Sequence, residues 1–365
     1  MRWALSADQT ELAEGLHGWL AHHAPTDVVR KHLDGGTAAE LEDTLLAEGW
    51  LQAGLAEEHG GAGGGLVELA VMVTELGRAA APSGRWTAAA AAAGLLAVPA
   101  IGEAVLAAVD GDLSTTAVGV RSDRVPSPRT PVELRDGALH GRVQLVLGGT
   151  GCRFVVLPVR DGDRVRLAVA DAAAAGCTRT PRRLLDRSRD AADLVLDGAT
   201  ATVVDAADED VPAALDAVAA HAAVLTAADS LGATERMLDL AVTYSLQRTQ
   251  FGVPIGSFQA VKHAAATVLV GIEAARSITF YAAASVAQGH PERAVHAAVA
   301  KAQSTRSGVR AADATLTMHG AIGYTWEHDL QLFYKRANLD AALFGDPDAW
   351  DDRVADALAL VPADA

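Results

Sequence analysis

Cysteine and positive charge are both scarce in this chain of 365 residues. The two cysteines, Cys152 and Cys177, cannot build a disulfide framework and lack the paired spacing of a metal site. Thiols without such a framework are typical of a cytoplasmic protein, and we predict that location. Lysine and arginine number 30 against 46 acidic residues, a net charge of -16. This charge argues against a nucleic-acid partner, because phosphates would be repelled.

Long hydrophobic runs are also missing. The longest uncharged apolar stretch, residues 87–102, is rich in alanine and interrupted by Pro99. It is too short and too weakly apolar to span a bilayer core of about 30 Å, so we expect no membrane partner. Hydrophobic residues nevertheless make up 50% of the chain, which is enough for a large globular core.

Helical patterns dominate the first part of the chain, and we predict an N-terminal helical domain over residues 1–111. Ser6 with Gln9 and Thr37 with Glu40 have the spacing of capping boxes ahead of apolar helical faces. The glycine cluster at 60–65 lacks the Gly-Lys-Ser/Thr ending of a phosphate loop. We therefore interpret it as a flexible entry to a helix that begins near residue 66.

Short valine-rich runs then replace the helical period and predict a small antiparallel β domain over residues 112–207. The expected strands cover 138–147, 153–159, 164–170 and 193–196, with Asp-Gly turns at 136–137, 161–162 and 197–198. Over residues 208–365 leucines again recur at helical spacing among alanines, whose small size lets helices pack closely in a bundle. The expected fold is mainly α with a central β domain.

The most informative segment runs from Arg248 to Gln259, between two helical patterns. A guanidinium can grip a diphosphate with two parallel hydrogen bonds, and the ring of Phe251 can lie against a flat ligand. The segment therefore suits a flavin dinucleotide. A lone arginine at a helix end that only interacts with the helix dipole is the simpler alternative.

This segment resembles the R-x-Q-F-G-x-x-I-x-x-F-Q signature of the acyl-CoA dehydrogenase family. A second stretch, residues 318–330, is similar to the family's H-G-G-x-G-[FY]-T-W-E-H motif. The resemblance implies the order helical domain, β domain and four-helix bundle, and FAD as cofactor. It also implies that Arg248, Gln250 and Phe251 contact the flavin diphosphate and adenosine across a subunit interface. The implied flavin contacts are Arg248, Gln250, Phe251, Ile255, Phe258, Gln259, Thr317, Gly320 and Ala321.

The second stretch departs from the family at Thr317, often Gln, and at Ala321, often Gly. Both departures lie near the implied flavin and would weaken its contacts. We expect no metal site, because His319 and His328 have no carboxylate-histidine set at ligand spacing. In the β domain only Ser122-Asp123 matches the flavin-covering T-E-x-x-x-G-S-D loop of the family.

The family's catalytic base is absent from both of its known positions. Removal of the α-proton of an acyl-CoA needs a carboxylate within hydrogen-bond reach. By resemblance the usual glutamate is replaced by Phe344, and an alternative glutamate on the first helix of the bundle falls near Ala222. Asp346 is a possible shifted base. Its alternative role is to cap a helix at its N-terminus.

Three hypotheses follow from the resemblance. The first is the non-basic partner in an α2β2 acyl-CoA dehydrogenase, with steroid side-chain CoA thioesters as one candidate substrate class. Such a complex forms a trans-2-enoyl-CoA and passes electrons to an electron-transfer flavoprotein. The second is a self-sufficient homotetramer that uses Asp346, and the third is a non-catalytic scaffold. The acyl group, the choice between homo- and hetero-oligomer, and the flavin stoichiometry stay open.

Overall fold

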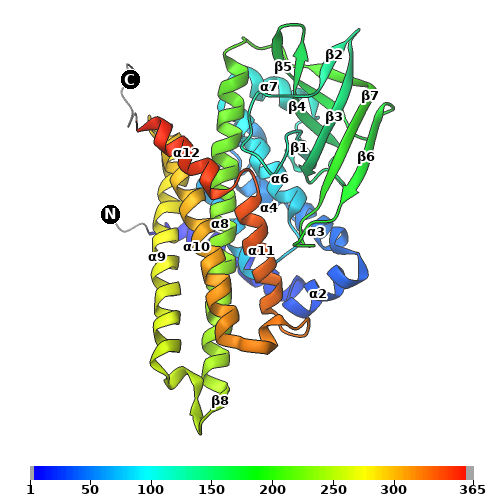
Figure 1. The fold of residues 1–365 in the computed structure, drawn as a ribbon. Coiled ribbons are helices and arrows are strands. Elements are labelled where there is room, and N and C mark those ends of the chain that lie inside the picture. Colours follow the sequence, from blue (N-terminus) through cyan, green and yellow to red (C-terminus); the bar gives the residue numbers. More distant parts are fainter. Residues whose placement is uncertain (1–3, 359–365) are drawn as a thin grey trace.

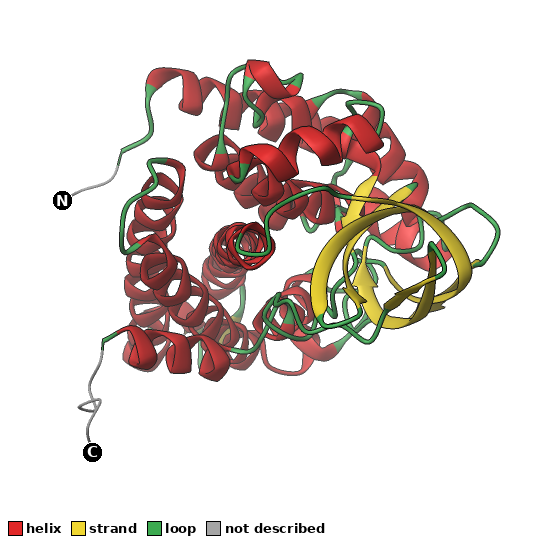
Figure 2. Ribbon diagram, turned by 90° about the horizontal axis from the view of Figure 1, so that it is seen from above, coloured by secondary structure: helices red, strands yellow, loops and turns green. Residues whose placement is uncertain are grey.

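The computed structural model describes residues 4–358, so the outer ends of the first and last expected domains lie outside the described residues. The chain runs from a helical region through a curved β-sheet into a long helical bundle (Figure 1). Seen from above, the sheet lies to one side of the helical body (Figure 2). This architecture confirms the predicted mainly α fold with a central β domain.

The N-terminal region contains helices α1 (Ala7–His23), α2 (Thr26–Gly35), α3 (Ala38–Ala47), α4 (Trp50–Ala53), α5 (Leu66–Ala79), α6 (Gly84–Ala92) and α7 (Pro99–Ala108), with 3-10 turns η1 (Glu57–His59), η2 (Ala93–Ala97) and η3 (Leu113–Thr115). The first capping box is confirmed, because Ser6 and Gln9 each accept the other's backbone N–H. The second is wrong, since the Thr37 hydroxyl bonds to the ring of His32 at 2.8 Å and caps nothing.

The glycine cluster leads into α5, as predicted. The carboxylate of Glu68 accepts the backbone N–H of Gly65 at 2.8 Å and so closes the first turn of the helix. A Cβ at Gly64 would overlap the carbonyl oxygen of Ala53, so this loop needs glycine to lie flat on the end of α4. The cluster therefore serves packing and helix entry.

The β domain contains strands β1 (Thr116–Val118), β2 (Glu133–Arg135), β3 (Ala138–Leu147), β4 (Phe154–Asp161), β5 (Arg164–Asp171), β6 (Cys177–Arg182) and β7 (Ala191–Val203). Most neighbouring strands are antiparallel, but β1 and β2 pair with β4 in parallel, which the sequence did not predict. The expected turn at Asp197-Gly198 is wrong. These residues form a bulge inside β7, where Gly198 takes a positive φ of 73°.

The C-terminal region contains α8 (Asp210–Gln247), α9 (Gln259–Ala287), α10 (Arg293–His319), η5 (Gly320–Tyr324), α11 (Leu330–Ala342) and α12 (Pro347–Ala357). Helices α8 to α11 form the bundle, and α5 packs on α8. Gly77 of α5 and Gly232 of α8 permit this packing, since a Cβ on either would overlap the backbone of the other helix. The crossing of α5 and α8 joins the N-terminal region to the bundle.

Helix α8 is the one described helix with the length and apolar character of a membrane span. Within its most apolar window, 72% of the residues are buried inside the protein. Its alanine-rich surface is covered by α5, α9, α10 and α11. The burial is that of the core helix of a bundle.

A cluster of charged groups, which we call the buried ion cluster, joins the three regions. It consists of Asp229, Arg336, Arg189 and Asp340. Arg336 of α11 donates two hydrogen bonds to the carboxylate of Asp229, at 2.8 and 2.9 Å, and Arg189 lies 2.7 Å from the same carboxylate. Arg336 also donates to the Ala81 carbonyl at 2.9 Å and to the Ser83 hydroxyl at 3.0 Å.

The charges of this cluster are set by its arginines. Burial alone would raise the pKa of Asp229, but Arg189 and Arg336 more than offset burial and hold that pKa well below its usual range. Burial and the nearby charge of Asp229 raise the pKa of Asp340 well above its usual range. One ionised carboxylate, that of Asp229, therefore faces the two arginines, and Asp340 is held in its neutral form.

We expect Arg336→Met to destabilise the protein by about 3–5 kcal/mol, because it removes one partner of a buried ion pair. Urea denaturation measures this free energy of unfolding. The matched control is Arg306→Met on α10, whose arginine pairs with the exposed Asp348 and Asp351 at the surface. The control should cost about 1 kcal/mol or less. Equal losses in the two variants would contradict a linking role for the buried ion cluster.

Candidate functional site

A hairpin at the end of α8 carries the arginine segment. Strands β8 (Thr249–Gln250) and β9 (Val253–Pro254) pair, and η4 (Ile255–Ser257) leads into α9. Phe251 and Gly252 form the two-residue turn with φ of 54° and 79°. Positive φ at both positions gives a hairpin turn that matches the twist of its strands. The hairpin projects from the end of the bundle far from the β domain (Figure 1).

The residues of this hairpin are exposed. Phe251 is 94% exposed, although a non-glycine residue at positive φ is uncommon. Its ring meets that of Phe258 edge to face, with the centroids 6.1 Å apart. Within residues 4–358 the guanidinium of Arg248 makes no hydrogen bond or ion pair. The exposed ring of Phe251 and the unpaired guanidinium of Arg248 are therefore accessible to a ligand or to a second subunit.

A surface cleft brings the two predicted segments together. Arg248, Gln250 and Ile255 line one side of a cavity of about 480 Å³, and the other side comes from the end of α10 and from η5. The predicted residues on that second side are Thr317, Gly320 and Ala321. Phe251, Phe258 and Gln259 lie outside this lining, on the hairpin and the start of α9. Six of the nine expected flavin positions therefore share one cleft.

Gly320 and the rings of Tyr244 and His319 line this cleft. Gly320 has φ 63° and ψ -142°, a conformation that glycine tolerates, and a Cβ there would meet no atom within 4 Å. The hydroxyl of Thr317 donates to the Asp313 carbonyl at 2.9 Å and is therefore occupied within α10. His319 stacks on Tyr244 with the ring centroids 4.8 Å apart, and burial lowers its pKa. The cleft is thus walled by a neutral imidazole and carries the positive charge of Arg248.

Of the three positions considered for a base, two carry no acid and the third, Asp346, is a helix cap. Phe344 is 4% exposed and takes a positive φ of 56°, and its backbone N–H donates to the Ser122 carbonyl at 2.6 Å. Ala222 is buried in α8. Asp346 is exposed and accepts the Ala349 N–H at 2.8 Å, so it caps α12. The carboxylate of Asp346 points to the first turn of a surface helix.

The loop after β1 also differs from the expected flavin cover. The hydroxyl and backbone N–H of Ser122 both donate to the Leu145 carbonyl, at 2.5 and 3.0 Å. The Ser122 carbonyl accepts the backbone N–H of Phe344, as described above. Every polar group of Ser122 is therefore bonded within the protein, and this loop is tied to the C-terminal region.

Comparison with known proteins agrees with this arrangement. Residues 6–104 match the acyl-CoA dehydrogenase N-terminal domain, and residues 212–358 match the acyl-CoA dehydrogenase C-terminal domain. Over 350 residues the chain is 31% identical to acyl-CoA dehydrogenase IpdE2 of Mycolicibacterium smegmatis, which covers 94% of this chain and 96% of the relative. The chain belongs to the acyl-CoA dehydrogenase family.

Solved structures share the fold over nearly the whole length. A variant of the Tcur3481-Tcur3483 steroid ACAD is 27% identical, covers 96% of this chain and 98% of its own, and has a TM-score of 0.83. The ChsE4-ChsE5 complex from Mycobacterium tuberculosis is 23% identical, covers all of both chains and has a TM-score of 0.83. The family is one of oxidoreductases whose members typically bind FAD.

The residues of this acyl-CoA dehydrogenase fit one part of FAD. A free guanidinium at Arg248, an open backbone at Gly320 and an exposed ring at Phe251 suit an anionic diphosphate joined to a flat base. Motif reasoning singled out these residues because each lies in one of two short contiguous motifs, 248–259 and 318–330. It missed Tyr244, which stands behind the cleft and carries no motif of its own.

We expect Asp346→Ala in this acyl-CoA dehydrogenase to cost about 1 kcal/mol of stability, the usual loss when a helix N-cap is removed. Catalytic turnover of the assembled enzyme should stay within twofold of the parent. Thermal melting and a dye-reduction assay measure the two effects. Asp346→Asn keeps a capping oxygen and is the matched control. Loss of turnover in Asp346→Asn, with its stability retained, would instead identify Asp346 as the base.

Proposed function

We propose that this chain is the subunit without a catalytic carboxylate in a heteromeric, FAD-dependent acyl-CoA dehydrogenase. A second family subunit would supply the base, and the α2β2 assembly would convert an acyl-CoA to a trans-2-enoyl-CoA. The observation that carries the proposal is the state of Phe344. The residue at the base position is apolar, buried, and fixed by a hydrogen bond from its backbone to Ser122.

The other two candidate positions for a base, Ala222 and Asp346, support the same assignment. Ala222 offers no proton acceptor, and Asp346 already serves as a helix cap. A base must lie within hydrogen-bond reach of the proton that it removes. Since neither position of this chain provides such a group, a carboxylate from a partner is the simplest source.

Exposed apolar side chains at the end of α8, in the hairpin and on α9 support an assembly. Leu246 near the end of α8 is 68% exposed and Val270 on α9 is 70% exposed, and Leu269 and Phe251 are exposed as well. Exposed apolar side chains of this size are common at protein interfaces. With Arg248 free beside them, the hairpin suits a flavin site that two subunits complete.

The names of similar proteins point in the same direction. One similar structure is named for two components, Tcur3481 and Tcur3483, and is described as a steroid ACAD. Another is the ChsE4-ChsE5 complex. We extend these descriptions to this chain, and so infer a two-component enzyme and a CoA thioester with a steroid-derived acyl group.

The residues of this chain would hold and orient the cofactor. Arg248 and Gln250 would donate hydrogen bonds to the FAD diphosphate, and Phe251 would pack against its adenine. When bound, FAD supplies the acceptor for the hydride that leaves the β-carbon. Electrons would then pass to an electron-transfer flavoprotein.

Co-expression with a family subunit that has glutamate at the position of Phe344 or Ala222 tests the proposal. Flavin content per chain and bleaching of the flavin absorbance by steroid and straight-chain acyl-CoA thioesters are measured. We expect bleaching by the pair and none by the isolated chain. Bleaching by the isolated chain would refute the proposal. A colourless pair that leaves the substrate unchanged would favour a scaffold protein.

We expect Arg248→Ala to lower the affinity of the assembled pair for FAD by at least about tenfold, because a hydrogen-bonded charge pair is lost. Equilibrium dialysis followed by flavin absorbance measures the affinity. Arg310→Ala is the matched control, since Arg310 is an exposed arginine on α10 that does not line the cleft. An unchanged affinity in Arg248→Ala would contradict the assigned role.

A further inference from the structure

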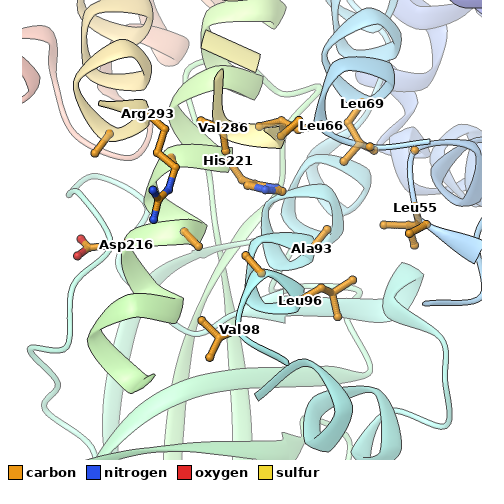
Figure 3. A pocket seen from close by; sticks show the side chains of 18 of the residues that line it. Leu55, Leu66, Leu69, Ala93, Leu96, Val98, Asp216, His221, Val286 and Arg293 are labelled. Atoms are coloured by element: carbon orange, nitrogen blue, oxygen red, sulfur yellow. The ribbon is translucent and has the colours of Figure 1, made fainter. Parts of the chain in front are cut away.

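A second cavity lies near the other end of α8, between the N-terminal helices and the bundle. Its volume is about 730 Å³. Leu66 and Leu69 of α5, Leu96 of η2, and Val98 before α7 form apolar walls. Figure 3 shows these side chains around the space, with His221 reaching in from α8 and Arg293 from the start of α10. This volume is within the range of small-molecule sites.

This cavity is distinct from the flavin cleft and from the expected base position. His221 and Arg248 are 27 positions apart on α8, which corresponds to about 40 Å along a helix axis. Ala213, Ala217 and Ala220 face the cavity. Ala222 follows Ala220 by two positions, a rotation of about 200°, so it lies on the opposite side of α8.

His221 gives the cavity an unmet hydrogen bond. Its Nδ1 atom is buried and has no hydrogen-bond partner within residues 4–358. Burial lowers the pKa of His221 to about 4, in spite of a hydrogen bond with the Ala90 backbone. The imidazole is therefore neutral at pH 7. An unpaired polar atom in a cavity with apolar walls is costly, unless a bound molecule supplies its partner.

Arg293 gives the cavity a free positive charge. Of the other charged groups at the rim, Asp216 pairs with Arg353 at 2.9 Å, and His59 lies 3.6 Å from Glu58. The guanidinium of Arg293 donates to the His290 carbonyl at 3.2 Å and has no carboxylate partner in the described part of the chain. Because Arg353 is already neutralised by Asp216, the positive charge of Arg293 is left for a ligand.

We propose that this cavity binds an apolar monocarboxylic acid. The carboxylate pairs with Arg293, and the hydrocarbon body lies against the leucines of α5 and η2. An acid that also carries a hydroxyl group on that body would pair Nδ1 of His221 as well. A guanidinium is the preferred partner of a carboxylate, and the apolar walls favour a hydrocarbon over a hydrated inorganic anion. The site needs no flavin and no second subunit.

Dodecanoate and dodecanol, titrated below their aggregation limits, test the charge requirement by calorimetry on the full chain. We expect Arg293→Gln to weaken dodecanoate about tenfold, and to change dodecanol less than twofold. Arg310→Gln on the same helix is the matched control and should bind both probes as the parent does. Equal dodecanoate affinities in Arg293→Gln and Arg310→Gln would overturn the proposal.

A cavity-filling variant tests the location. Ala217→Phe should abolish the binding of both probes, with thermal melting used to confirm that the variant folds. If it does not fold, Ala213→Phe replaces it, since this alanine lines the same cavity at an exposed position. Unchanged binding in a folded variant would place the probes elsewhere. Arg248→Ala should leave dodecanoate binding intact. The proposed FAD role of Arg248 and the proposed carboxylic-acid site at Arg293 can therefore fail independently of each other.

Discussion

The pairing of Asp229 with Arg336 and Arg189 is the interaction on which the arrangement of the three regions depends. Asp229 lies on α8, Arg336 on α11 and Arg189 in the segment before β7. Arg336 also donates a hydrogen bond to the carbonyl of Ala81 in the N-terminal region. A buried charge that loses its partner is far more costly than a surface charge. The cluster therefore makes the relative placement of the helical regions and the sheet specific, where apolar packing alone would tolerate small shifts.

The same cluster also helps to fix the loop that contains Phe344, the expected position of a base. Asp340 sits beside Asp229 at the end of α11, and Lys301 donates to the Asp340 backbone carbonyl at 2.7 Å. Lys301 is fully buried, and this burial lowers its pKa to about 7. Four residues after Asp340 the chain reaches Phe344, which Ser122 of the β domain holds by its backbone. The loop at the base position is thus fixed from both sides.

Local signals in the sequence were enough to predict many of the helices and strands of this molecule. The Ser6 capping box, the helix entry at Gly65 and strand β3 follow from neighbouring residues, and the structure has them where they were predicted. The segment proposed to bind flavin was recognised because its residues are contiguous. The buried ion cluster was not predictable, because Asp229 and Arg336 lie 107 positions apart. The Asp197-Gly198 bulge looks like a turn until the pairing of β3 with β7 is known.

The absence of a base at Phe344 is therefore a property of its surroundings as well as of one side chain. A glutamate at this position would keep the positive φ and the bond to Ser122, and it would enter a site that is 4% exposed. Burial without a cationic partner raises the pKa of a carboxyl group and favours its neutral form, which cannot accept a proton. Phe344 fills this buried position with an apolar side chain, which agrees with the proposal that a partner subunit supplies the base.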